Sequence, residues 1–146
     1  MFYIPTHFTW PELLPESVYR ELELLKRLDR CALLLDNRIL ITADRLRARY
    51  GKLVCNTWSF GGQHQFRGYR PQDCTVGAAL SQHRFGRALD LIPAQATAVE
   101  IRADIRAHPE LETFEHITCV EDDVDWLHVD CRNWDRTRLG IQFVKP

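Results

Sequence analysis

The spacing of apolar residues along the chain predicts three helices. Residues 16–30 carry apolar side chains near helical spacing, and residues 36–50 repeat this pattern ahead of Gly51, which suits the end of a helix. Residues 97–108 form a third segment with one apolar stripe, and Pro109 stops it. Because such stripes usually face a core, we expect the three helices to pack against the rest of the chain.

Shorter apolar segments predict strands at residues 52–58, 88–92, 113–120, 126–131 and 140–144. The stretch from residue 59 to 79 is instead rich in glycine and polar residues, which indicates a long loop of the kind that often carries function. Helices and parallel strands do not alternate along the chain. We therefore predict an α+β fold in which a mostly antiparallel sheet has helices on one side.

Composition limits the classes of protein that fit. The 146 residues, 45% of them hydrophobic, suit a single domain over 1–146 with a real core. The 19 basic and 20 acidic residues give a formal net charge of −1, without the basic excess of a nucleic-acid binder. The chain has no signal-peptide pattern at its start and no apolar run of membrane-spanning length, so we expect a cytoplasmic product that does not insert into membranes.

The five cysteines do not form a recognisable metal or catalytic signature. None has the Cys-x-x-Cys spacing of a structural zinc site, and the odd number leaves at least one thiol free. We interpret them as reduced thiols, with Cys55 and Cys119 buried in strands, although the sequence also allows a disulfide between Cys74 and Cys131. Catalysis by a Cys–His pair is the rival enzyme chemistry, and no motif in the chain supports it.

Two short segments carry the candidate chemistry. A catalytic Zn²⁺ typically takes three ligands from His and Asp or Glu and leaves one position for water, and His83, Asp90 and His128 can supply that set. A nearby carboxylate then serves as general base, and Asp125 is our candidate. Simpler interpretations exist for each ligand taken alone. Asp90 can form a salt bridge to a neighbouring arginine, Arg84 or Arg87, and His83 can be an ordinary polar loop residue.

The position of Asp125 leaves an alternative open. In a strand over residues 126–131, alternation puts Trp126, His128 and Asp130 on one face. Asp125 reaches that face only if the strand begins, bulges or bends there. Asp130 is therefore the alternative functional carboxylate, as a partner that orients a histidine.

The two segments together resemble the signatures of the M15 peptidases, the zinc D-Ala-D-Ala carboxypeptidase and L-Ala-D-Glu endolysin family related to the hedgehog signalling domain. The residues that match its Ser-x-His-(x)6-Asp and Asp/Glu-x-x-His motifs are Ser81, His83, Gly86, Ala88, Asp90, Asp125 and His128. The resemblance implies that His83, Asp90 and His128 bind zinc and that Asp125 is the base. It also implies a hedgehog-like α+β fold.

Further resemblance lies outside these motifs. The stretch over residues 7–13 is similar to the family's Phe-Thr-x-x-Glu-Leu start, and the stretch over residues 67–71 is similar to its Ser-Gly-Tyr-Arg segment. In the family that arginine binds the substrate carbonyl and steadies the oxyanion, which implies this role for Arg70. Arg67 stands where the family has a small residue and is the alternative for the same task. Ser81 is carried over as a substrate contact.

We therefore expect zinc-dependent hydrolysis of peptide bonds in peptidoglycan stem peptides, as a D,D-carboxypeptidase or an L-Ala-D-Glu endopeptidase. A cell-wall enzyme made in the cytoplasm suggests a phage-type lysin that acts after release or as part of a virion. The alternative is a non-catalytic, zinc-containing structural or binding module of a virion, with the same fold and with phage virion proteins as its partners. The sequence defines neither the bond that is cut nor the oligomeric state.

Overall fold

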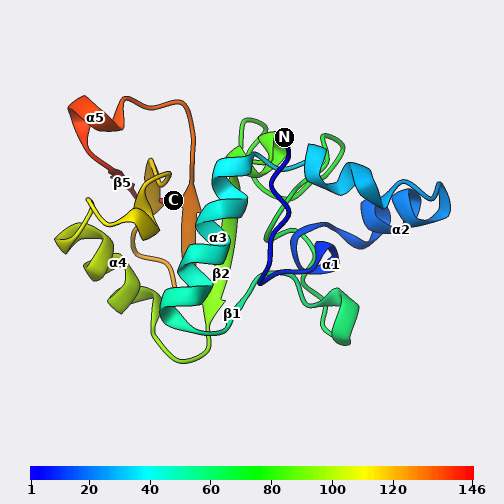
Figure 1. Cartoon of the computed structure of the whole chain (residues 1–146), viewed down its shortest axis with the longest axis horizontal. Helices are drawn as coiled ribbons and strands as arrows, with labels where there is room; N and C mark the ends of the chain where they lie inside the picture. The colour runs from blue at the N-terminus through cyan, green and yellow to red at the C-terminus, as the bar shows by residue number, and fades with distance from the viewer.

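A five-stranded mixed sheet forms the centre of the protein, whose computed structural model describes residues 1–146 (Figure 1). The strands are β1 (Leu53–Val54), β2 (Ala88–Pro93), β3 (Cys119–Glu121), β4 (Leu127–Asp130) and β5 (Gln142–Val144), in the order β1-β2-β4-β3-β5. The pairs β1–β2, β2–β4 and β3–β4 are antiparallel, and β3–β5 is parallel. The predicted α+β fold with a mostly antiparallel sheet is thus confirmed.

The helices include two that the sequence predicts closely. The α-helices are α1 (Trp10–Leu13), α2 (Glu16–Leu24), α3 (Asn37–Tyr50), α4 (Ala98–Ala107) and α5 (Arg136–Leu139). The 3-10 helices are η1 (Leu28–Leu33), η2 (Trp58–Phe60), η3 (Gln82–Phe85) and η4 (Glu112–Phe114). Asp36 caps α3 by accepting a hydrogen bond from the backbone N–H of Arg38, and Thr97 and Glu100 form a capping box on α4. The helices predicted over residues 36–50 and 97–108 are confirmed.

The helix predicted over residues 16–30 is wrong in its second half. The chain leaves α2 after Leu24, Lys26 takes a positive φ of 53°, and η1 follows as a separate turn. A positive φ in a residue other than glycine breaks the hydrogen-bond pattern of an α-helix. None of the residues of α2 is buried, so packing does not hold a longer helix together there.

Two predicted strands are shorter than expected. After β1, the backbone N–H of Asn56 donates to the carbonyl of Glu12, and the Asn56 side chain donates to Leu14, so this stretch pairs with the helical segment rather than extending the sheet. The segment over residues 113–120 begins as η4 and enters the sheet only at Cys119. Its carbonyls at Phe114, Glu115 and Ile117 accept hydrogen bonds from the Arg136 guanidinium and are therefore not available for a strand ladder.

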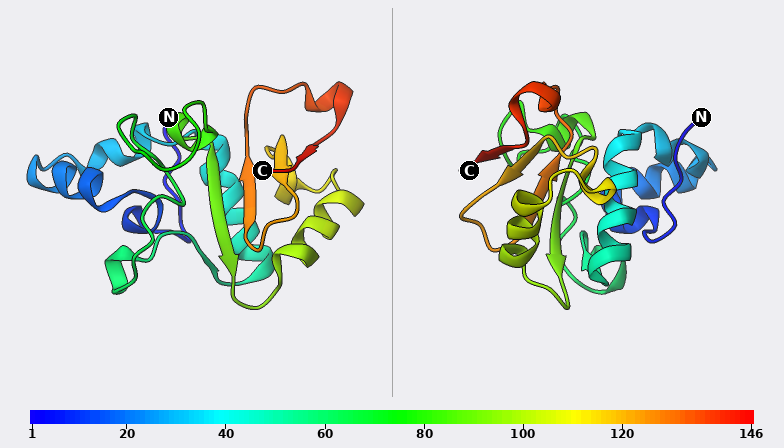
Figure 2. Two further views of the ribbon diagram at one scale, coloured as in Figure 1. Left: turned by 180° about the vertical axis from the view of Figure 1, so that it is seen from behind. Right: turned by 60° about the vertical axis from the view of Figure 1, so that its left-hand side comes forward.

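The two faces of the sheet have different chemistry. Leu89 and Leu91 of β2 and Leu127 and Val129 of β4 belong to one continuous core of 22 buried residues, which makes the chain a single domain. The helix α3 covers this face, and it lies behind β2 and β4 in the left view of Figure 2. The opposite face carries Asp90 and other polar side chains, as the alternation within the two strands requires.

The N-terminal segment is tied to α3 by one buried carboxylate. Asp44 accepts hydrogen bonds from the Tyr3 hydroxyl at 2.8 Å, from the backbone N–H of Thr6 at 2.6 Å and from the backbone N–H of His7 at 2.9 Å. The Thr6 hydroxyl donates to it as well. These bonds anchor the chain before α1 and satisfy a carboxylate that is only 5% exposed.

All five cysteines are free thiols, so no disulfide joins Cys74 to Cys131. Cys119 lies in β3 and Cys55 directly follows β1, and both are buried. Burial raises the pKa of Cys119 and Cys131 to about 12, which disfavours the thiolate that a nucleophile requires. Among the helices, none has both the length and the apolar character needed to cross a membrane.

Candidate metal centre

Three side chains from η3, β2 and β4 meet on the polar face of the sheet. Asp90 and His128 are direct partners in the antiparallel pairing of β2 with β4, and the Nδ1 atom of His128 lies 2.7 Å from Oδ1 of Asp90. The Nε2 atom of His83 lies 3.3 Å from Oδ2 of the same carboxylate. One ligand atom from each residue lies within 4.8 Å of the others, and all three residues are buried. This group can bind a metal ion.

His83 is oriented by the backbone around it. Gly86 ends η3 with a positive φ of 66°, after which the chain enters β2. The Nδ1 atom of His83 lies 2.8 Å from the carbonyl oxygen of Gly68, so this nitrogen carries the proton and Nε2 faces Asp90. Gly68 reaches this place because it has no side chain: a Cβ atom there would lie 2.1 Å from the carbonyl oxygen of Leu13.

His128 is oriented by a second carboxylate. Its Nε2 atom lies 3.2 Å from Oδ2 of Asp130, which is fully buried. Arg132 holds Asp130 in turn, through Nε at 2.9 Å from Oδ1 and Nη2 at 2.5 Å from Oδ2. The arrangement directs Nδ1 of His128 toward Asp90, as partners of a metal-binding histidine do. The structure therefore gives Asp130 the orienting position that the sequence left as an alternative.

The charges of the cluster reinforce one another. Burial by itself raises the pKa of Asp90, but hydrogen bonds from His128 and His83 outweigh it and hold that pKa well below the usual range. Burial lowers the pKa of His128, and hydrogen bonds to Asp130 and Asp90 overcome this and raise it to about 9. The metal-free cluster is thus held by an imidazolium between two carboxylates. A divalent cation can take the place of that positive charge.

Arg70 and Ser81 stand beside the ligands. The Arg70 guanidinium donates from Nη2 to Oδ2 of Asp90 at 3.2 Å, from Nε to the Phe66 carbonyl at 2.7 Å and from Nη1 to the Ser81 hydroxyl at 3.5 Å. Asp90 thus has Arg70 as its cationic partner, not Arg84 or Arg87. Arg84 donates to loop carbonyls, and Arg87 faces Asp36.

Arg67 lies apart from this group. Its carbonyl oxygen accepts a hydrogen bond from the backbone N–H of Asp90, while its Nη1 atom points to the Cys55 carbonyl at 3.4 Å. Arg67 does not line the cavity above the ligands, whereas Arg70 does. Of the two arginines, only Arg70 lies at the cavity beside His83, Asp90 and His128.

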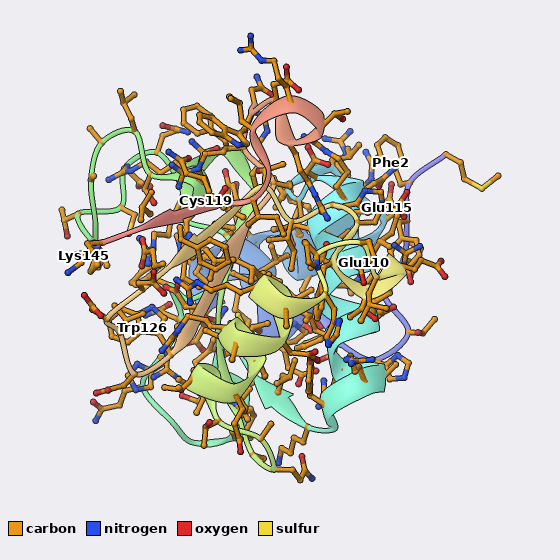
Figure 3. The ribbon with its side chains drawn as sticks, turned by 90° about the vertical axis from the view of Figure 1, so that its left-hand side faces the viewer. Phe2, Glu110, Glu115, Cys119, Trp126 and Lys145 are labelled. Carbon is orange, nitrogen blue, oxygen red and sulfur yellow. The ribbon has the colours of Figure 1, made fainter.

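A cavity of about 500 Å³ opens over the cluster. Its lining residues are Arg70, Gly77, Ala78, Leu80, Ser81, Gln82, His83, Asp90, Glu121, Trp126, His128, Arg132 and Pro146. The loop before η3 forms one wall of the cavity. Trp126 and Leu80 are the large apolar side chains that line the cavity. Figure 3 shows Trp126 on the opposite side of the molecule from Phe2 and Glu115.

The structure does not bring Asp125 to the ligands. Asp125 is exposed and lines a separate depression beside α4. The Arg102 guanidinium holds the loop on both sides of Asp125 by donating to the carbonyls of Val124 and Trp126, both at 2.9 Å. The strand β4 begins only at Leu127, so nothing turns Asp125 onto the face of His128. Its role as base stays a prediction from the resemblance.

Glu121 is the carboxylate that the sequence did not single out. The pairing of Val120 with Val129 places Glu121 next to His128 across β3 and β4, and its Oε2 atom lies 3.9 Å from Nδ1 of His128. Glu121 lines the cavity. Glu121 begins an acidic segment of the sequence. Only the alternation of β3 distinguishes it from the acidic residues that follow, and this alternation identifies Glu121 only once the register of β3 with β4 is known.

No family model matches the chain, and neither a curated protein nor a solved structure matches it.

Proposed function

We propose that the protein is a zinc-dependent peptidase that acts on peptidoglycan stem peptides. The observation that carries the proposal is the buried group of His83, Asp90 and His128 at the base of an open cavity. Two imidazoles and one carboxylate are the donor set of catalytic zinc sites, which keep a position free for water. No cysteine lines the cavity, so the donors do not resemble a closed thiolate site.

The residues around the ligands suit hydrolysis. Zinc bound there would supply a Lewis acid and a water of lowered pKa. Arg70 presents a guanidinium beside the ligands, where it can bind the substrate carbonyl and stabilise the negative charge that develops on its oxygen. Trp126 and Leu80 present apolar surface at the cavity, and a substrate that covered it would exclude water and strengthen these electrostatic interactions.

The proton acceptor in this proposal is a carboxylate beside the cavity. The geometry supports Glu121 as this proton acceptor, because it lines the cavity and its Oε2 atom lies 3.9 Å from Nδ1 of His128. The motif resemblance supports Asp125 instead. Glu121 is the last residue of β3, whereas Asp125 lies within the loop of residues 122–126 that leads to β4, and mutagenesis distinguishes them as described in the Discussion.

The substrate class rests on the resemblance to the M15 peptidases, with cleavage of either the D-Ala-D-Ala or the L-Ala-D-Glu bond. A phage-type lysin is the matching biological role. A non-catalytic zinc module in a virion is the alternative, and it is less well supported because a purely structural metal site requires neither Arg70 nor a carboxylate at its open side.

The test is mass spectrometry of purified peptidoglycan after incubation with the zinc-loaded protein. We expect new peptide ends with the wild-type protein and none with His83→Ala. His108→Ala is the matched control, because His108 is an exposed histidine far from the cavity lining. Intact muropeptides with stoichiometric zinc would contradict the peptidase and favour the virion module. The masses of the new ends identify the bond.

A further inference from the structure

Arg132 has one guanidinium nitrogen that the protein does not use. Its Nε and Nη2 atoms both donate to Asp130, and its Nη1 atom makes no hydrogen bond within the chain. The side chain is 29% exposed and lines the cavity above the ligands. The guanidinium is therefore fixed along one edge and has a free donor at its other end.

Arg70, the other arginine of the cavity, differs in this respect. All three of its guanidinium nitrogens have partners, in Phe66, Ser81 and Asp90. A guanidinium held by a bidentate carboxylate is preorganised, so a further hydrogen bond from it costs little side-chain entropy. Arg132 is thus the cation of the cavity best placed to bind an additional anion.

The charge around the cavity also favours an anion. With a divalent ion bound and both imidazoles neutral, the positive groups are the ion, Arg70 and Arg132, against the three carboxylates of Asp90, Glu121 and Asp130. Four positive charges then oppose three negative ones. Arg132 lies beyond Asp130 as seen from His128, so an anion at Nη1 would lie to one side of the ligands and not on the metal position.

We propose that Arg132 binds a carboxylate of the substrate through Nη1 and so selects peptides that carry a free carboxylate on the residue after the cleaved bond. The inference rests on the proposed peptidase function. Both candidate bonds meet its requirement, because the terminal D-Ala and the D-Glu residue each retain a carboxylate. The second task of Arg132, holding Asp130, is separate from this one.

The test compares matched N-acetylated peptides that differ only in this group. D-Ala-D-Ala is compared with its C-terminal amide, and L-Ala-D-Gln, whose γ-amide stands for the γ-linkage of the stem peptide, is compared with its own C-terminal amide. The ratio of kcat/KM for the acid over the amide is measured with the zinc-loaded wild type, Arg132→Lys and Arg132→Gln. We expect the wild type to prefer the acid by at least about tenfold and both variants to lose most of that preference. Arg138→Gln, an exposed arginine outside the cavity, is the control and keeps the wild-type ratio.

The ratio separates recognition from structural damage. Loss of the Asp130 contact would slow acid and amide alike and leave their ratio unchanged, so an unchanged preference in both variants would overturn the proposal. Equal rates for acid and amide in the wild type would overturn it as well. If the wild type cleaves neither peptide, the proposed peptidase has failed, and calorimetric binding of the same peptides still decides whether Arg132 forms a carboxylate site.

Discussion

Asp44 and Asp90 both bury their carboxylates, and only Asp90 belongs to the candidate functional site. Asp44 in α3 is 5% exposed and Asp90 in β2 is 9% exposed, and in both the pKa is held below its usual range against the effect of burial. The partners differ. Asp44 accepts hydrogen bonds from backbone N–H groups and hydroxyls, whereas Asp90 lies between two imidazoles and a guanidinium.

The comparison shows that the partners, and not the burial, identify the functional carboxylate. Two backbone N–H groups and two hydroxyls saturate the Asp44 carboxylate and hold the N-terminal segment, and the one imidazole nearby, that of His7, is exposed and lies 3.7 Å from Oδ1. His83 and His128 each present a ring nitrogen toward Asp90, Nε2 and Nδ1 respectively, and such a nitrogen can bind a metal ion when it is unprotonated. Asp90 is also reached from a cavity, which Asp44 is not.

The largest expected effect separates these two aspartates directly. Asp90→Asn removes one of the three proposed ligands, and we expect the proposed hydrolysis to fall by at least about 10⁴-fold, because the metal supplies the Lewis acid of its chemical step. Zinc stoichiometry and the rate of peptide release measure this. Asp44→Asn is the matched control and should keep its rate per folded molecule. Equal losses in the two variants would remove the distinction.

The Glu121 carboxylate lies at the open side of the cluster, and its replacement tests which carboxylate acts as the general base. We expect Glu121→Gln to keep zinc and to lose about 10³ in kcat with little change in KM, since a general base acts in the chemical step. Asp125→Asn is measured beside it. A larger loss in the Asp125 variant would show that the motif predicts the base better than the geometry described here.

The structural role of Asp44 predicts a loss of stability. Asp44→Ala removes the acceptor of four hydrogen bonds, three of them from the exposed residues Thr6 and His7, and we expect the free energy of unfolding to fall by about 3 kcal/mol. Urea unfolding of the zinc-loaded protein measures it. A loss below about 1 kcal/mol would mean that water replaces the carboxylate at this site.

The candidate metal centre, unlike the Asp44 site, should lose stability at alkaline pH. The pKa of His128 is raised from 6.5 to about 9, so its charge stabilises the metal-free protein fully below pH 6.5, and this contribution disappears as the pH rises through 9. We expect a loss of up to about 3 kcal/mol between pH 6 and pH 10 in urea unfolding with a chelator present. With zinc bound, the ion replaces the proton, and the loss should vanish. Equal slopes with and without zinc would contradict this.

The smallest expected effect concerns the partner of His128. Asp130→Asn keeps the shape of the side chain but weakens its hold on the imidazole, and we expect zinc affinity to fall by about tenfold. Competition with a chromophoric chelator measures the dissociation constant. Unchanged affinity would show that the ring is oriented by Asp90 alone.

Local pattern was sufficient for part of the fold and of the site. The strand predicted over residues 88–92 is present as β2, and its alternation puts Asp90 on the face opposite to Leu89 and Leu91. The prediction for residues 16–30 was wrong because the turn at Lys26 depends on how η1 packs, which apolar spacing does not report. The strand expected over residues 113–120 was too long because Arg136 takes the carbonyls of that segment from 19 to 22 residues away.

By itself, the sequence determined which residues are candidate ligands, because the alternation within each of β2 and β4 and the spacing from His83 to Asp90 are local properties, and the structure brings His83, Asp90 and His128 together. Only the tertiary structure decided which other charges join the ligands. The register of β3 against β4 places Glu121 beside His128, and Arg102, reaching from α4, holds the loop that keeps Asp125 outside. Both depend on contacts between residues far apart along the chain, and no local spacing encodes them.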